Sequence, residues 1–205
     1  MTLGLNLILI IITVIISFSA FNRPELAERL KFNAYRIRHA GESWRFLTYA
    51  LVHADWLHLL VNMYVLYAFG RLVEQAFITG FGNIGYLYYG LLYIGGVIFS
   101  TLFDFGKNKD NPYYNAVGAS GAVSAVLFAS ILLHPFGSIF IFPIPFSIPS
   151  WVFGILYIIY SAYMGRRGKD NIGHNAHLWG AIFGLVFTII LIPGSVGQLI
   201  TYLFG

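Results

Sequence analysis

Three groups of polar residues lie inside apolar stretches of the sequence, and each could take part in chemistry. The stretch "HADWLHLLVN" holds His53, His58 and Asn62. Ser120 stands in "GASG", at the start of the apolar run "NAVGASGAVSAVLFA". The stretch "HNAHLWGAIFG" carries two histidines three residues apart. Because a polar group inside a membrane costs free energy, each group is a candidate functional site.

Together these residue types suit nucleophilic catalysis. A serine needs a base to take its proton, and histidine is the usual partner. Attack on an amide or ester also needs donors where negative charge develops. His58 and Asn62, four residues apart, share one helical face, and the N–H of Ser120 at a helix start adds a third donor. Gly118 and Gly121 would let a substrate backbone approach closely.

Other interpretations of these residues stay open. A serine in a membrane helix often bonds the carbonyl one turn back, and His and Asn can simply hold helices together. Four histidines on two helices could bind zinc or iron, although Asp55 is the one carboxylate among them. The predicted helices around Ser120 and His177 hold no acidic residue for a triad, so a Ser–His dyad is the catalytic interpretation.

The composition predicts a membrane protein. Of the 205 residues, 58% are hydrophobic and 10% are charged, whereas a soluble domain carries about 25% charged residues. There is no cysteine, which excludes disulfides, thiolate metal sites and a cysteine nucleophile. The net charge of +4 is no nucleic-acid signal, because half of the twelve basic residues lie between residues 23 and 45 among acidic ones.

Six apolar blocks predict membrane-spanning helices, since only helices and closed barrels satisfy the backbone in lipid and the blocks do not alternate. They lie at about 3–21, 56–77, 82–103, 118–134, 150–164 and 174–192. The first block lacks the basic start and cleavage site of a signal peptide, so we expect a retained helix. The proline-rich connection 135–149 is not counted as a span.

The link between the first two helices, "NRPELAERLKFNAYRIRHAGESWRF", mixes charged and apolar residues as an interfacial segment does. With six spans, the odd-numbered loops hold eleven of the twelve basic residues, all but Arg71. The positive-inside rule alone would therefore place those loops in the cytoplasm.

From about residue 42 to 190, the sequence resembles the rhomboid intramembrane serine proteases. "GASG" resembles the family's Gly-x-Ser-Gly motif, which implies Ser120 as nucleophile and Gly118 and Gly121 as its setting. "AHLWGAIFG" resembles the family's Ala-His-x-x-Gly-x-x-x-Gly motif, which implies His177 as base. In that motif the glycines, here Gly180 and Gly184, pack against the serine helix.

"HADWLHLLVN" resembles the second-helix pattern His-x4-His-x3-Asn, so His58 and Asn62 would stabilise the oxyanion. The resemblance implies structural roles for four further residues: His53, Trp44, Arg45 and Glu74.

The sequence departs from the family pattern at Ser124, where an aromatic often stacks on the base. Either a hydroxyl holds the imidazole, or another aromatic takes this place. His174 competes with His177 as base, but it lacks the small residues downstream that bring the two helices together. His174 could be a hydrogen-bond partner or could gate water.

The resemblance implies a single rhomboid protease domain over residues 1–205, an all-α six-helix bundle with a long interfacial first loop. It implies an intramembrane serine endopeptidase that needs no metal or other cofactor, with substrate transmembrane segments and the bilayer as partners and no nucleic acid. It also implies a bacterial inner membrane and an active site open to the outer face, against the loop charges. The alternatives are an inactive rhomboid-like binder and a histidine-based metal-binding membrane protein.

Overall fold

The structure is a computed structural model that describes residues 3–140, 145–167 and 172–204. Its helices before the serine motif are α1 (Leu5–Phe21), α2 (Pro24–Leu30), α3 (Ala34–Ala40), α4 (Arg45–Thr48), η1 (Tyr49–Leu51), α5 (Trp56–Val65), η2 (Leu66–Gly70), α6 (Arg71–Phe81) and α7 (Ile84–Asn108). The remaining elements are α8 (Ser120–Leu133), β1 (Ser138–Phe140), β2 (Ser147–Pro149), α9 (Ser150–Arg167), α10 (His174–Leu191) and α11 (Gly194–Phe204).

The chain is mostly helical, and its long helices suit a membrane. Among the described residues, three helices are long and apolar enough to cross one: Trp56–Phe81, Ile84–Asn108 and His174–Leu191. Helices α1 and α8 are apolar but shorter. The six-span count therefore stays a prediction, although a helix lies within or across each of the six predicted blocks.

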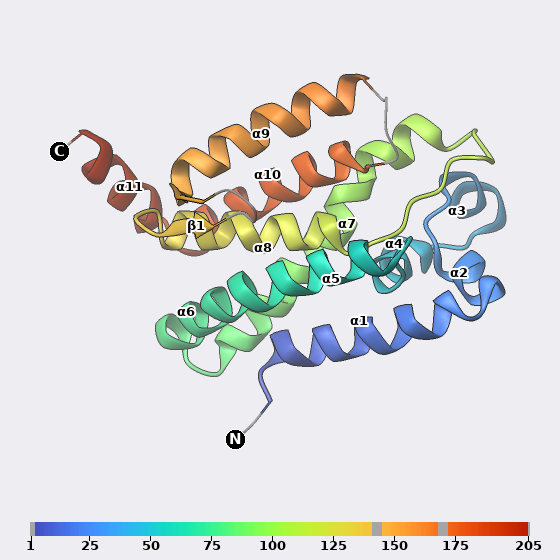
Figure 1. Cartoon of the computed structure of the whole chain (residues 1–205), viewed down its shortest axis with the longest axis horizontal. Coiled ribbons are helices and arrows are strands. Elements are labelled where there is room, and N and C mark those ends of the chain that lie inside the picture. Colours follow the sequence, from blue (N-terminus) through green and yellow to red (C-terminus); the bar gives the residue numbers. More distant parts are fainter. Residues whose placement is uncertain (1–2, 141–144, 168–171, 205) are drawn as a thin grey trace.

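Helix α8 lies at the centre of the bundle, with α9 and α10 on one side and α5 and α6 on the other (Figure 1). Every residue from 121 to 132 is buried. A helix surrounded on all sides must be apolar all round, and the many alanines and serines of α8 let its neighbours approach closely.

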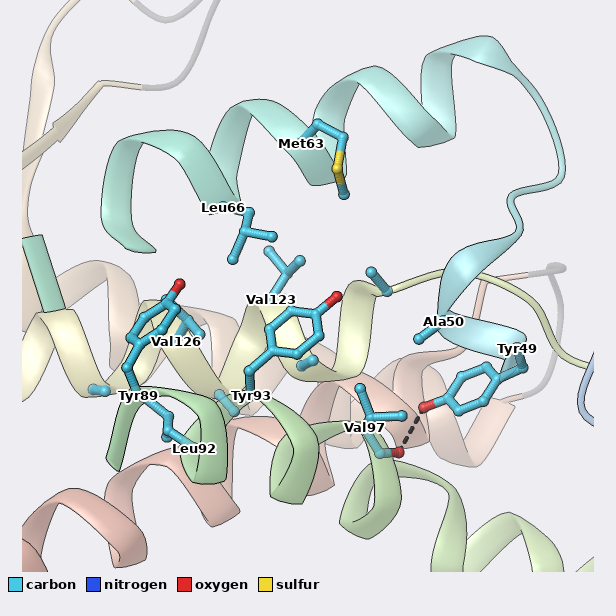
Figure 2. Packing of buried hydrophobic residues seen from close by; sticks show 14 of the residues in the cluster. Tyr49, Ala50, Met63, Leu66, Tyr89, Leu92, Tyr93, Val97, Val123 and Val126 are labelled. Carbon is cyan, nitrogen blue, oxygen red and sulfur yellow. Dashed lines mark hydrogen bonds between the residues drawn. The ribbon is translucent and has the colours of Figure 1, made fainter. Parts of the chain in front are cut away.

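The core around α8 is built from apolar side chains of α5, η2 and α7. In Figure 2 the side chains of Met63 and Leu66 point from their helix towards the side on which Val123 of α8 lies. Tyr49 lies beside α7, where its hydroxyl donates to the carbonyl oxygen of Val97 at 2.7 Å. This bond fixes η1, which leads into α5, against α7.

The segment between α1 and α5 folds into three short α-helices and the 3₁₀-helix η1, and a buried arginine holds part of it together. Arg45 is 1% exposed, and its guanidinium donates to the carbonyl oxygens of Glu28 at 2.9 Å and Lys31 at 2.6 Å. It also pairs with the carboxylate of Glu42. A buried guanidinium needs such partners, so Arg45 ties α2 to the start of α4. The position of this segment at a membrane surface stays a prediction.

Several elements were absent from the sequence prediction. The predicted span 56–77 continues to Phe81 and contains the π-helical turn η2. The connection 135–149 carries the antiparallel hairpin β1–β2, and α11 follows the last predicted block. Residues 141–144 of that connection and Lys169 of the predicted loops lie outside the described residues.

Candidate functional site

Ser120 is the first residue of α8, and the backbone before it is held by two other segments. The N–H of Gly118 donates to the carbonyl oxygen of Tyr49 at 3.0 Å, and the N–H of Ala119 donates to His53 Nε2 at 3.3 Å. Gly118 has φ +110°, a conformation that favours glycine. Ser120 is partly exposed, whereas the two residues before it and the whole turn after it are buried.

His53 links this turn to α1. Because its Nε2 accepts from Ala119, its proton resides on Nδ1 and is donated to Ser17 Oγ at 2.9 Å. The Ser17 hydroxyl in turn donates to the carbonyl oxygen of Leu51 at 2.8 Å. The structure thus places His53 behind the turn, in contact with the residue before Ser120; its structural role stays a prediction.

His58 and Asn62 lie on α5 beside the same turn. Asp55 caps the helix by accepting from the N–H of His58 at 2.7 Å. A Cβ added to Gly118 would lie 2.5 Å from His58 Cε1, so only glycine leaves room for this imidazole. Asn62 is buried and donates one hydrogen of its amide to the carbonyl oxygen of His58 at 2.8 Å. His58 of the predicted oxyanion pair therefore lies against the "GASG" turn, and Asn62 is bonded to the backbone of His58.

Helix α10 packs its backbone directly against α8. A Cβ on Gly180 would overlap the carbonyl oxygen of Gly121, and one on Gly184 would overlap that of Ala125. His177 lies one turn before Gly180, and the carbonyl oxygen of its neighbour Ala176 would lie 3.3 Å from a Cβ added to Gly121. The spacing of the two glycines thus brings the helix of the predicted base against the helix of the predicted nucleophile.

His177 is flanked by two rings. His174 is buried, and its ring centroid lies 6.0 Å from that of His177 at an interplanar angle of 80°. Tyr157 of α9 lies 6.2 Å from His177 at 32°. Its hydroxyl lies 2.6 Å from Ser124 Oγ. Of the two options left open at Ser124, this arrangement supports the second, because the ring of Tyr157 lies beside His177 while its hydroxyl contacts Ser124.

Three residues of the predicted set lie away from Ser120. Arg45 lies in the first loop, and Trp44 before it is half exposed. Glu74 lies at the start of α6, where it accepts from the N–H of Asn6 at 3.1 Å. These contacts join parts of the fold and touch none of the residues around Ser120.

The sequence did not single out Tyr49 or Phe32, yet both position the serine motif. Phe32 pairs backbone to backbone with Ala116, with N–H to O distances of 2.9 and 3.1 Å. The Tyr49 hydroxyl also lies 2.8 Å from Ser100 Oγ, beside which Gly121 packs. Phe32 lies in the charged link and Tyr49 just after it, and only their contacts reveal this role.

Among the described residues, no three His, Asp or Glu side chains lie close enough to hold a metal ion. In this part of the chain, the arrangement of side chains therefore lends no support to the metal-binding alternative.

Acid is expected to destabilise the fold through His53. Burial, with His58 nearby, lowers the pKa of His53 from 6.5 to about 3, and Asp55 only partly opposes this. Below pH 6.5 the unfolded chain binds a proton that the folded protein does not. The stability is therefore full above that pH and falls towards pH 3 by at most about 1.4 kcal/mol per unit. Thermal unfolding in detergent at stepped pH measures this loss.

His53→Phe is the matched variant for that measurement. This variant should lower the free energy of unfolding by about 1–3 kcal/mol at pH 7.5, because the Ala119 N–H loses its acceptor. It should also reduce the dependence of stability on pH below pH 6.5. His134→Gln, which changes an exposed histidine, is the control. A slope unchanged in His53→Phe would contradict this account.

The fold and the site define a helical integral membrane protein with a polar site where α5, α8 and α10 begin. The rhomboid domain family model matches residues 40–194. The chain belongs to the rhomboid family, and the predicted resemblance is confirmed.

Named relatives agree with this assignment. The chain is 29% identical over 158 residues to RHOMBOID-like protein 12, mitochondrial, of Arabidopsis thaliana, which covers 69% of this chain and 44% of that protein. It is 29% identical over 152 residues to Rhomboid protease GlpG of Haemophilus influenzae, covering 73% of this chain and 70% of the relative. Rhomboid-like protease 5 of Toxoplasma gondii is 30% identical over 162 residues, 74% of this chain and 16% of its own. The chain thus spans less than half the length of the Arabidopsis and Toxoplasma relatives.

Proposed function

We propose that this protein is an intramembrane serine endopeptidase that cleaves transmembrane segments of other proteins with a Ser120–His177 dyad. The observation that carries the proposal is the contact of Gly180 with the carbonyl oxygen of Gly121. It sets the turn of α10 that bears His177 against the turn of α8 that begins with Ser120.

In the proposed reaction, His177 takes the proton of Ser120, whose Oγ attacks the scissile carbonyl carbon. The tetrahedral intermediate collapses when the C–N bond breaks and His177 returns the proton to the departing amine. Water, deprotonated by His177, then attacks the acyl-enzyme, and the released Oγ regains a proton from His177. The residues involved need no metal or other cofactor for these steps.

The negative charge of the intermediate would be held at the start of α8. The first N–H groups of a helix have no partner within it, and the helix dipole favours an anion there. His58 lies over the adjacent Gly118. Asn62 gives one amide hydrogen to the His58 carbonyl and keeps its second for a substrate oxygen.

Loss of the amide of Asn62 is expected to lower kcat by roughly 10²–10³-fold with little change in KM, because the contact forms only with the oxyanion. Cleavage of a model transmembrane substrate in liposomes by Asn62→Ala measures this. Gln75→Ala is the control, since Gln75 is an exposed amide on the same long helix. A kcat equal to that of the control would remove Asn62 from the mechanism.

Substrates would reach the site laterally between α5 and α9. Both helices present large apolar side chains outward, among them Leu60 at 65% and Ile159 at 60% exposure. An intact helix offers no free peptide group for attack, so segments weakened by Gly, Pro or polar residues are the expected substrates. We place the N-terminus in the cytoplasm of a bacterium and the site towards the outer face of its inner membrane.

The test is Ser120-dependent cleavage of such a substrate, with labelling by a serine-directed fluorophosphonate alongside. Both signals should be present in the wild type and absent from Ser120→Ala.

A further inference from the structure

Tyr157 of α9 contacts both helices of the proposed dyad. Its ring centroid lies 6.2 Å from that of His177 on α10 and 5.4 Å from that of Phe128 on α8. Both separations fall in the range in which aromatic rings attract each other. The ring therefore restricts one side of the imidazole that would accept the serine proton.

The hydroxyl of Tyr157 reaches the serine end of α8. Ser124 Oγ donates its only proton to the carbonyl oxygen of Ser120 at 2.8 Å. In the 2.6 Å contact between the two hydroxyls, Tyr157 is therefore the donor and Ser124 Oγ the acceptor. A chain of two hydrogen bonds thus runs from α9 to the backbone of Ser120.

Helix α9 is otherwise less firmly held than α8 or α10. Only Ser150, Gly154 and Ser161 are buried in it, and a Cβ on Gly154 would meet Phe128 and Ile131 at ordinary contact distances of 3.5 Å. Tyr157 therefore links the position of α9 to both members of the dyad, whereas the contact of Tyr160 with His174 reaches only the helix of His177.

We propose that Tyr157 is a positioning residue for the dyad. Its ring orients His177, and its hydroxyl orients Ser120 through Ser124. The dyad is therefore aligned only while α9 is seated against α8. This inference rests on the proposed function. Under this inference α9, which forms one wall of the proposed substrate path, is also part of the active site. A substrate that displaces α9 would misalign the dyad until α9 returns.

The experiment compares three changes at this contact with two controls on the same helix. Tyr157→Leu removes ring and hydroxyl, Tyr157→Phe removes the hydroxyl alone, and Ser124→Ala removes its acceptor. Tyr163→Leu controls for loss of a tyrosine, because Tyr163 is 50% exposed. Ile158→Ala loosens the packing of α9 on the bundle without touching the hydrogen bonds of Tyr157. The readouts are fluorophosphonate labelling rate, kcat and KM, and thermal unfolding.

Tyr157→Leu should lower the labelling rate and kcat by about 10²-fold, the effect of a misplacement near 1 Å, with KM little changed. Tyr157→Phe should lower both rates by about fivefold, as loss of one hydrogen bond near 1 kcal/mol does. Ser124→Ala should lower them by at least as much, because it also removes the bond to the Ser120 carbonyl oxygen. The double variant should match Ser124→Ala. Tyr163→Leu should label like the wild type. Ile158→Ala should lower the labelling rate by less than Tyr157→Leu, because it loosens the packing of α9 but leaves the ring and hydroxyl of Tyr157 in place.

The inference would be overturned if Tyr157→Leu were labelled at the rate of Tyr163→Leu, or if its effect were confined to KM. It would also be overturned if the effects of Tyr157→Phe and Ser124→Ala added up in the double variant. If Tyr157→Leu unfolds, the test of the inference is the double-mutant cycle of Tyr157→Phe and Ser124→Ala. A wild type without Ser120-dependent labelling overturns the proposed function and this inference with it. Labelling that depends on Ser120 but not on Tyr157 overturns this inference alone.

Discussion

Ser120→Ala is expected to abolish cleavage of a transmembrane substrate, with a fall in kcat of at least about 10⁴-fold. Removal of a nucleophile that forms a covalent intermediate has effects of this size in serine hydrolases. Alanine lacks only the hydroxyl, and Ser120 is partly exposed as the first residue of α8, so the fold should be retained. Cleavage in liposomes and fluorophosphonate labelling measure the loss, and an unchanged melting temperature excludes unfolding.

The same assay identifies the base. His177→Ala should lose activity to a similar extent, because nucleophile and base act as one unit and their losses are not additive. His174→Ala is the matched control, since the two histidines lie on one helix with ring centroids 6.0 Å apart. His174 contacts Tyr160 on α9, with ring centroids 5.5 Å apart, and its loss should reduce activity far less. The reverse order would make His174 the base.

Other outcomes favour the alternative functions. Labelling that survives Ser120→Ala would show that the nucleophile lies elsewhere. A wild type that binds transmembrane segments but neither cleaves them nor reacts with the probe would favour an inactive binder. Metal that copurifies and is lost from variants of His53, His58, His174 and His177 would favour the metal site.

The residues of the candidate site could be proposed from the sequence because they lie in short local motifs, and the rhomboid resemblance implied the role of each. Four-residue spacing places His58 and Asn62 on one face of a helix, and "GASG" predicts a close-packed turn at a helix start. The four-residue spacing of Gly180 and Gly184 predicts a small-residue face, and the structure shows that face against the backbone of α8.

What escaped prediction depends on contacts between distant segments. Tyr157 is one of several aromatics in an apolar helix, and nothing in its neighbours distinguishes the ring that meets His177. The short helices α2 and α3 are stabilised by tertiary contacts such as those of Arg45, because isolated helices of seven residues are unstable in water. The strands β1 and β2 pair over three residues each, which is too short for an alternation of apolar and polar residues to predict them.

Gly180→Ala is expected to lower both stability and activity, although it adds a single methyl group. The new Cβ would overlap the carbonyl oxygen of Gly121, which is backbone and cannot rotate away. Helices α8 and α10 must then separate, at a cost of about 1–3 kcal/mol or more. Separation also withdraws His177 from Ser120, and a shift near 1 Å costs about 10²-fold in rate. Thermal unfolding and labelling rate measure the two effects.

Gly106→Ala is the control for this prediction, because an added Cβ on Gly106 of α7 would meet no atom beyond the adjacent residues and backbone of its own helix within 4 Å. There alanine should raise stability by up to about 1 kcal/mol through its better helix propensity, with activity unchanged. If glycine-to-alanine substitution lowers stability at Gly180 and raises it at Gly106, then the backbone contact, rather than helix propensity, determines the effect at Gly180. A Gly180→Ala variant as stable and active as the wild type would mean that the two helices do not meet at Gly121, and the dyad would lose the contact that aligns it.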